Sequence, residues 1–225
     1  MRARQPQLAK IRRCPDCCLH RSLYLCALIP LVPTRTRVVL VMHQLELNKP
    51  TNTGRLAVRC LPNSEVLVRG LPSGAFPPVA VAETAPSGAA TRLLLFPHAD
   101  AQPLERWRDS PAPVTLIVPD GTWRQAAKAR RRVAGLDRIP CVSLPARLSG
   151  YRLRQATRPG RFSTMEAIAR ALGILEGGDV EEQLAHIHQV MVDRTLWTNG
   201  RLSSEAVTGG IPEGVQSHDP LSGVR

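Results

Sequence analysis

The sequence predicts an α/β fold in which a mostly parallel β-sheet carries helices on both faces. Short apolar runs recur along the chain, as expected for strands that are buried in a parallel sheet. Segments with helical spacing lie between and after these runs, the order typical of parallel strands joined by crossover helices. The expected strands cover residues 38–42, 65–69, 93–96, 114–118 and 142–144.

The first half of the chain supplies two of these strands. Residues 38–42 read Val-Val-Leu-Val-Met, a run typical of a buried strand. Residues 54–61 fit a short helix that Pro62 ends, and residues 65–69 form the next strand. Residues 70–88 are rich in Pro, Gly, Ser and Ala, so we expect a long surface connection there.

The second half continues the alternation. Pro97 closes the strand at 93–96, and the strand at 114–118 runs directly into Pro119-Asp120-Gly121. A helix is expected over 122–133, then a short strand at 142–144. Two further helices are expected over residues 163–176 and 180–197.

Composition and charge limit the classes to which the protein can belong. The chain has 225 residues, 43% of them hydrophobic, which is enough for an ordinary core. Its 30 Lys and Arg residues against 18 Asp and Glu leave a formal charge of +12. A bias of genome composition can exchange Lys for Arg, but it does not remove acidic residues. The excess positive charge therefore indicates a polyanionic partner such as nucleic acid.

The chain shows no export or membrane signal. The longest apolar stretch, residues 23–32, is interrupted by Pro30 and is much shorter than the roughly 20 residues that span a bilayer. Asp16 and His20 precede this stretch, and Pro-Thr-Arg-Thr-Arg follows where a cleavage site would lie. We therefore expect a cytoplasmic protein, in which clustered cysteines are more typical of metal sites than of disulfides.

Four segments follow from these patterns. We expect a basic arm over residues 1–13, a cysteine-rich knuckle over 14–30, a catalytic α/β domain over 31–197 and a mobile tail over 198–225.

The turn after the fourth strand is the most informative local sequence. Gly121 permits a tight turn, and Thr122 with Gln125 has the spacing of a capping box at a helix N-terminus. Asp120 would then face the crevice at the carboxyl ends of the strands, where ligands bind in open α/β sheets. Alternatively, this segment is only a strand–turn–helix junction with Asp120 as a turn residue.

Asp120-Gly121-Thr122-Trp123 resembles the signature of the DTW-domain family. Residues 43–46, 51–57 and 163–169 resemble other blocks of that family, in the same order along the chain. The resemblance runs from about residue 14 to residue 175. One four-residue motif would be weak support, but four ordered blocks are specific.

The resemblance implies an enzyme. Members of this family are tRNA-uridine aminocarboxypropyltransferases, which transfer the 3-amino-3-carboxypropyl group of S-adenosylmethionine (SAM) to a tRNA uridine. The product is acp3U, in bacteria typically in the variable loop, and methylthioadenosine is released. The family is similar in fold to the knotted, SPOUT-like RNA methyltransferases. RNA methylation by the same fold, and a non-catalytic RNA-binding module, remain alternatives.

The resemblance also assigns roles to residues. Uridine N3–H must lose its proton as N3 attacks the carbon next to the sulfonium, and Asp120 is the candidate to accept or orient that proton. We expect alignment to contribute more than proton transfer. The expected SAM contacts are Thr51, Asn52, Thr53, Gly54, Pro97, Gly121, Thr122, Ser163 and Thr164. For the 51–54 and 163–166 segments, helix capping alone is the alternative.

The expected tRNA surface is basic. Arg124, Lys128 and Arg131 share one face of the helix at 122–133 and would contact phosphates. Trp123 and Arg154 complete the expected RNA contacts, and solvated side chains are the alternative for each single cation.

A zinc site is expected near the N-terminus. Cys14, Cys17 and Cys26 resemble part of a metal-binding knuckle. The family pattern places another cysteine at position 24, which is Tyr24 here, so Cys18 or His20 would supply the fourth ligand. Free thiols without metal are the alternative. Cys60 and Cys141 read as small core residues.

Overall fold

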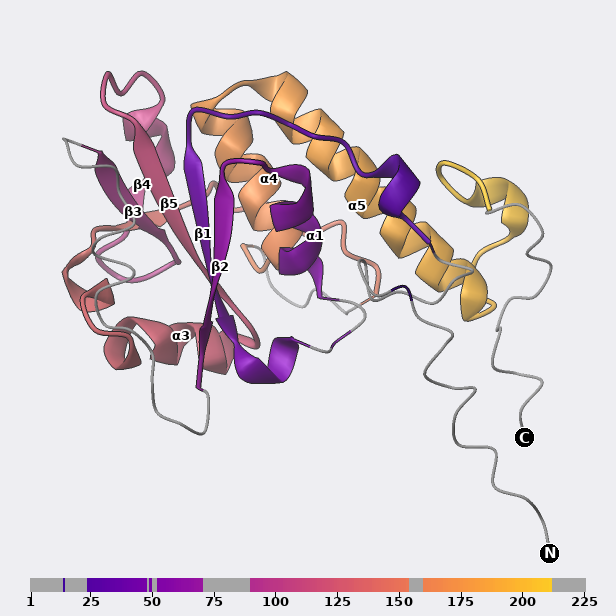
Figure 1. Cartoon of the computed structure of the whole chain (residues 1–225), viewed down its shortest axis with the longest axis horizontal. Coiled ribbons are helices and arrows are strands. Elements are labelled where there is room, and N and C mark those ends of the chain that lie inside the picture. The colour runs from indigo at the N-terminus through magenta and orange to yellow at the C-terminus, as the bar shows by residue number, and fades with distance from the viewer. Residues whose placement is uncertain are drawn as a thin grey trace, which may run out of the picture.

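Six parallel strands form one sheet at the centre of the computed structural model (Figure 1). The structure describes residues 14, 24–47, 49, 52–70, 90–153 and 160–211. The strand order is β2-β1-β5-β3-β6-β4, and every strand pairing in the described chain is parallel. The strands are β1 (Arg37–His43), β2 (Ser64–Arg69), β3 (Thr91–Leu95), β4 (Gln102–Pro103), β5 (Val114–Asp120) and β6 (Cys141–Ser143).

Helices cover both faces of this sheet, as the sequence predicts. Helices α1 (Thr53–Cys60), α4 (Thr164–Leu175) and α5 (Gly178–Thr198) pack on one face, and α4 lies along α5. Helix α3 (Trp123–Arg132) packs on the other face. Alternating side chains of β1 divide between the two cores: Leu40 faces α1 and α4, whereas Val41 faces α3.

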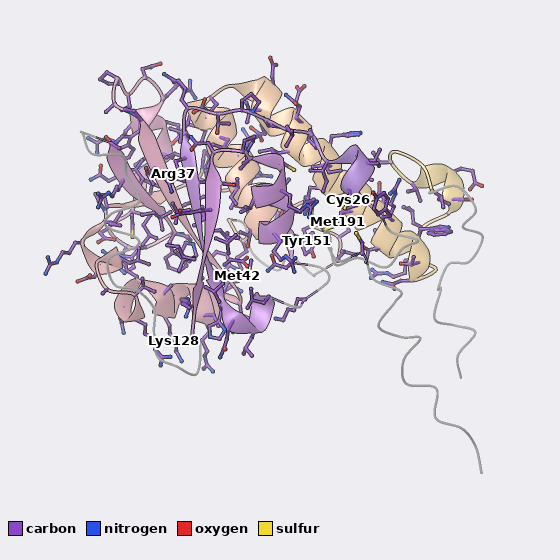
Figure 2. The ribbon with its side chains drawn as sticks, in the orientation of Figure 1. Cys26, Arg37, Met42, Lys128, Tyr151 and Met191 are labelled. Atoms are coloured by element: carbon purple, nitrogen blue, oxygen red, sulfur yellow. The ribbon has the colours of Figure 1, made fainter. Side chains whose placement is uncertain are left out.

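Strand β5 lies between β1 and β3 and is buried along its whole length. The sequence predicts that this strand ends at Val118, but pairing with β1 continues until Met42 lies opposite Asp120. Asp120 is therefore the last residue of a central strand rather than a residue of the following turn. Figure 2 marks Met42 at this end of β1.

One further strand differs from the sequence prediction. Strand β4 was not predicted, because two exposed residues carry no hydrophobic pattern. Within the tail predicted to be mobile over 198–225, the described residues after α5 pack against that helix. Val207 is buried there, and Thr208 donates a hydrogen bond to Asp193. The connection predicted over 70–88 lies almost wholly outside the described residues, as does the basic arm.

The N-terminal segment crosses the same helix. Leu25 is fully buried, and Arg194 of α5 donates a hydrogen bond to the carbonyl oxygen of Tyr24. Nowhere in the described ranges is a helix both long and apolar enough to cross a bilayer.

Candidate active site

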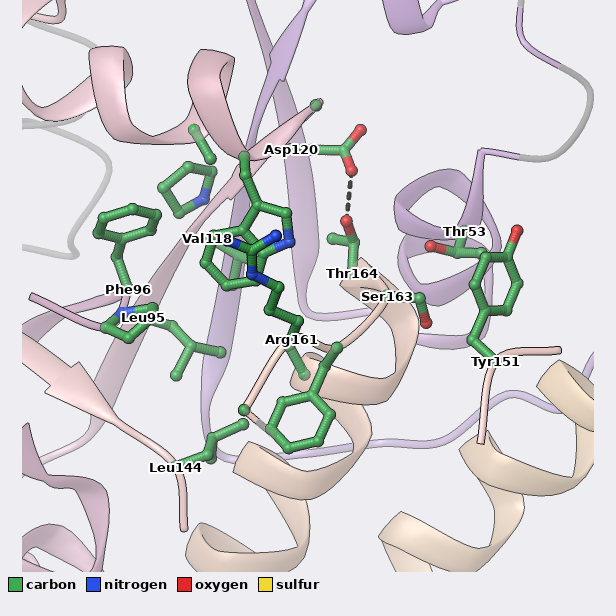
Figure 3. A pocket seen from close by; sticks show the side chains of 18 of the residues that line it. Thr53, Leu95, Phe96, Val118, Asp120, Leu144, Tyr151, Arg161, Ser163 and Thr164 are labelled. Carbon is green, nitrogen blue, oxygen red and sulfur yellow. Dashed lines mark hydrogen bonds between the residues drawn. The ribbon is translucent and has the colours of Figure 1, made fainter. Parts of the chain in front are cut away.

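A cavity of about 500 Å³ opens at the carboxyl ends of β1, β3, β5 and β6 (Figure 3). Its walls come from the segments that follow these strands and from the first turns of α1 and α4. This is the edge at which open parallel sheets bind ligands, and the volume suits a small organic molecule. The cavity therefore brings together segments that are far apart in the sequence.

Asp120 lies on this cavity with only 3% of its surface exposed. Asn52 donates to its Oδ2 at 2.7 Å, and the Thr164 hydroxyl donates to its Oδ1 at 2.5 Å. Both oxygens of the carboxylate are thus fixed by donors from two different helix starts. A buried carboxylate held in this way has a defined orientation toward a ligand in the cavity.

The start of α1 carries the first of these donors. Asn52 is the N-cap of α1: its Oδ1 accepts from Arg55 N at 2.8 Å, while its Nδ2 donates to Asp120. Thr53 also lines the cavity and accepts a hydrogen bond from Met165 N. Gly54 is buried behind Asp120 rather than on the cavity wall. Thr51 lies outside the described residues.

The turn after Asp120 has the capping box that the sequence predicts. The Thr122 hydroxyl accepts from Gln125 N, and the Gln125 side chain accepts from Thr122 N. Gly121 lines the cavity with φ of 142°, a backbone conformation that favours glycine. Thr122 is exposed at the helix start and is not among the lining residues.

The start of α4 is tied to the loop that follows β6. Ser163 and Glu166 form the predicted capping box, and Ser163 lines the cavity. The Glu166 carboxylate also accepts from Ser149 Oγ at 2.6 Å and from Gly150 N at 2.7 Å. One carboxylate therefore fixes the position of the loop that carries Tyr151.

Tyr151 and His188 form a buried stack beside this loop. Their ring centroids lie 5.3 Å apart, and His188 Nε2 lies 3.4 Å from Ser163 Oγ. Burial lowers the pKa of His188 to about 4, and the nearby negative charge of Glu166 opposes this shift. His188 is therefore a neutral packing residue behind the cavity wall.

The mouth of the cavity is aromatic and basic. Trp123 is 37% exposed, and its ring lies 6.0 Å from that of Phe96. The Arg161 guanidinium lies 5.5 Å from the centroid of the Trp123 ring. Pro97 also lines the cavity, as the sequence suggests for the end of its strand.

Three of the remaining predicted RNA contacts do not line this cavity. Arg124, Lys128 and Arg131 are exposed on α3, and Lys128 projects away from the sheet (Figure 2). Arg154 lies outside the described residues.

Sequence reasoning did not identify several lining residues. Phe96 and Leu144 directly follow strands, so the strand-end rule would have found them. Lys49, Arg161 and Phe162 lie in connecting segments without such a signal. Glu46 belongs to a block that resembles the DTW-domain family, but no local pattern indicates that its carboxylate lies on the cavity.

The cysteine cluster is only partly described. Cys14 Sγ and Cys26 Sγ lie 3.7 Å apart, whereas Cys17, Cys18 and His20 lie outside the described residues. Within the described ranges, His, Cys, Asp and Glu side chains form no cluster of three or more that could hold a metal ion. Cys60 and Cys141 are buried core residues, and burial raises the pKa of Cys60 to about 12.

Comparison with known proteins identifies a matching family model and several similar proteins. A family model described as the DTW domain matches residues 11–196. The tRNA-uridine aminocarboxypropyltransferase 2 of Macaca fascicularis is 32% identical over 203 residues, which are 85% of this chain and 67% of that protein. The tRNA-uridine aminocarboxypropyltransferase A of Arabidopsis thaliana is 28% identical over 210 residues, 80% of this chain and 79% of the relative.

A third relative matches over a shorter range. The tRNA-uridine aminocarboxypropyltransferase 2 of Drosophila melanogaster is 40% identical over 85 residues, 37% of this chain. The match spans about a third of that protein, 34% of its length. No solved structure matches the chain.

Proposed function

This chain belongs to the DTW domain family, and we propose that it is a tRNA-uridine aminocarboxypropyltransferase that uses SAM as the donor. The observation that carries the proposal is Asp120, a buried carboxylate on a cavity of about 500 Å³, held by Asn52 and Thr164. Relatives from an insect, a primate and a plant carry this activity in their names.

The cavity fits a donor that is apolar at one end and polar at the other. Leu95, Phe96 and Leu144 line one side, and the hydroxyl groups of Thr53, Tyr151 and Ser163 lie on the other (Figure 3). We place the adenosyl group against the apolar side and the amino-acid end toward the polar side. Bound there, SAM supplies a carbon activated by its sulfonium, so that a bond from uridine N3 to this carbon replaces the C–S bond and methylthioadenosine leaves.

Asp120 handles the proton in this proposal. Asn52 and Thr164 hold its carboxylate in one orientation, and in this proposal a carboxylate oxygen accepts the N3–H of a uridine bound at the cavity. The proton passes from N3 to Asp120, and from there to solvent after product release. A fixed carboxylate also aligns the uridine ring, which contributes through proximity.

The tRNA approaches from the mouth of the cavity. Trp123 presents an exposed ring there, on which an unstacked base can lie, as in many RNA-binding sites. The exposed cations of α3 follow Trp123 along the same helix and supply contacts to phosphates.

Two structural features belong to this proposal by family resemblance. We expect the chain to have the knotted, SPOUT-like topology near the cavity. We also expect a structural zinc ion held by Cys14, Cys17 and Cys26 with Cys18 or His20, a set that suits tetrahedral zinc. The Sγ atoms of Cys14 and Cys26 lie 3.7 Å apart, which is close enough for both thiols to bind one metal ion.

Label transfer from SAM tests the proposed reaction. The purified protein is incubated with tRNA and with SAM labelled either in the carboxyl carbon or in the methyl carbon. We expect the carboxyl label in tRNA, methylthioadenosine as the small product and acp3U in the nucleoside mass spectrum. Transfer of the methyl label with release of S-adenosylhomocysteine would show RNA methylation instead. Binding of tRNA without transfer of either label would favour a binding module.

An Asp120→Asn variant tests the proposed role of the carboxylate. General acid–base groups contribute about 10²- to 10⁴-fold to rate, so turnover should fall by at least about 10²-fold at saturating SAM. A variant that keeps most of its turnover would remove Asp120 from the mechanism and leave the reaction itself in place.

A further inference from the structure

The turn after β1 places one acidic and one basic side chain on the cavity wall. Glu46 ends the short 3-10 helix Gln44–Glu46, and Lys49 lies three residues further along the chain. Both line the cavity, and Lys49 Nζ lies 2.6 Å from Glu46 Oε1. The proposed reaction of Asp120 uses neither of them.

The Glu46 carboxylate is buried but not fully occupied. The side chain of Glu46 is only 4% exposed, whereas that of Lys49 is 44% exposed. Lys49 donates a hydrogen bond to Oε1 of this carboxylate, and no other described residue donates to the carboxylate. Oε2 accepts no hydrogen bond from the described residues and is not sealed from solvent. A second donor can therefore reach Oε2 from the cavity.

Backbone hydrogen bonds connect this pair to Asp120. Lys49 N donates to Glu46 O at 3.1 Å, and Asn52 N donates to Lys49 O at 3.1 Å. The side chain of Asn52 then donates to Asp120. Successive turns thus hold the Glu46–Lys49 pair at a set position relative to the carboxylate that we assign to proton transfer.

A carboxylate beside an ammonium group matches a zwitterion. The α-ammonium of an amino acid can donate to Glu46, and its α-carboxylate can accept from Lys49. An ionised phosphate accepts hydrogen bonds but does not donate them, so it would engage Lys49 alone, and an uncharged nucleoside would leave both charges without a counter-charge. An isolated surface ion pair contributes little to stability, so stability alone gives little reason to bury Glu46 on a cavity wall.

We propose that Glu46 and Lys49 form the subsite for the α-amino acid end of the donor. This assignment rests on the proposed function, because the group to be transferred carries that zwitterionic end. Glu46 binds the ammonium through Oε2, and Lys49 binds the carboxylate. Holding this end separately from the adenosyl end fixes the propyl carbon, rather than the methyl group, next to Asp120 and the target nitrogen.

Two adenosine probes isolate the subsite. S-adenosylhomocysteine has the amino-acid end but no reactive sulfonium, and methylthioadenosine lacks the amino-acid end. Calorimetry of the full-length chain measures the affinity of both probes for the wild type, Glu46→Gln and Lys49→Met. Each variant should lose about 10- to 100-fold in affinity for S-adenosylhomocysteine, the range of charge-assisted hydrogen bonds. Affinity for methylthioadenosine should stay within about twofold, which also shows that the variant is folded.

Glu65→Gln is the matched control. Glu65 pairs with Arg37 at 2.7 Å, an ion pair of similar length that does not line the cavity. This variant should leave the affinities of both probes unchanged.

Three outcomes would overturn the assignment in distinguishable ways. If neither variant binds S-adenosylhomocysteine more weakly than the wild type does, the amino-acid end binds elsewhere. If the variants bind both probes equally more weakly than the wild type does, the pair is structural and not a subsite. Because the side chain of Lys49 is exposed, Lys49→Met should fold normally, so its result separates this outcome from misfolding. If the wild-type chain binds neither probe, the proposed function fails, and this inference fails with it.

Discussion

Gly54 of α1 lies directly against the carboxyl group of Asp120. A Cβ atom built at Gly54 would meet Asp120 Cγ and Oδ1 at 3.0 Å, and Leu40 Cδ2 also at 3.0 Å. The missing side chain lets α1 approach the end of β5 closely enough for Asn52 to reach Asp120. The geometry of the candidate catalytic carboxylate therefore depends on a residue that does not line the cavity.

Replacing Gly54 by Ala should displace Asp120. The added methyl group forces the carboxylate, Leu40 or α1 to move, and overpacking of this kind costs about 1 to 3 kcal/mol. We expect a lower free energy of unfolding in urea and a larger fractional loss in kcat than in affinity for S-adenosylhomocysteine. Gly178→Ala is the control, since a Cβ at Gly178 meets nothing within 4 Å. Unchanged turnover in Gly54→Ala would show that Asp120 tolerates the shift.

The hydroxyl of Thr164 should matter more than its methyl group. Thr164→Val keeps the shape of the side chain but removes the donor to Asp120 Oδ1, whereas Thr164→Ser keeps the donor. A hydrogen bond to a charged group contributes about 1.5 to 3 kcal/mol, so kcat should fall by about tenfold or more in the valine variant. Rates of methylthioadenosine release measure this. Equal losses in the two variants would assign Thr164 to packing.

His188 should make stability depend on pH between about 4 and 6.5. Its pKa in the folded chain is about 4, lowered by burial, whereas an unfolded histidine has a pKa of about 6.5. In this range the unfolded chain binds a proton that the folded chain does not, so its stability falls as the pH falls from 6.5 toward 4. The full effect is on the order of 3 kcal/mol.

A His188→Phe variant removes this contribution. Phenylalanine keeps the stack on Tyr151 but does not titrate, so the free energy of unfolding should change less between pH 6.5 and pH 4 than in the wild type. Urea unfolding at a series of pH values measures the difference. His186→Gln is the control, because His186 is exposed on the same helix. A variant with the wild-type pH dependence would remove His188 as the cause.

The sequence predicted the sheet better than the cavity wall. Strands such as β1 and β5 are buried on both faces, so their continuous apolar runs are visible without any knowledge of packing. The rule that ligands bind at strand ends then led to Asp120. Lys49 and Arg161 instead reach the cavity through the paths of connecting loops, which depend on contacts with distant segments. A local sequence pattern does not predict those contacts.

The segment after α5 also makes contacts that no local sequence pattern indicates. Its Gly- and Ser-rich composition predicts mobility, and in the structure Thr208 donates to Asp193 Oδ2 through both its backbone N and its hydroxyl. Asp193 is buried, and its Oδ1 accepts from Gln189 and Arg152. The hydrogen-bond partner of Thr208 lies 15 residues earlier, on helix α5.

Asp193→Asn should therefore loosen this tail. The asparagine NH₂ group would face donors in place of a carboxylate oxygen, at a cost of about 2 kcal/mol in the free energy of unfolding. Hydrogen exchange should increase around Thr208 and in the loop that carries Arg152. Asp109→Asn, at an exposed position, should change neither quantity. Unchanged exchange at Thr208 would show that apolar contacts such as that of Val207 suffice.

The exposed cations of α3 should set the salt dependence of tRNA binding. Each phosphate contact releases counterions, so removing one should reduce the slope of log K against log salt by about 0.7 to 0.9. The combined replacement of Arg124, Lys128 and Arg131 by Ala should therefore reduce the slope by about 2. It should lower the affinity for different tRNAs by the same factor. Arg201→Ala, on the exposed turn after α5, should leave the slope unchanged. Because α3 packs on the face of the sheet opposite α4, the triple variant should keep its affinity for S-adenosylhomocysteine. A triple variant with the wild-type slope would move the tRNA surface away from α3.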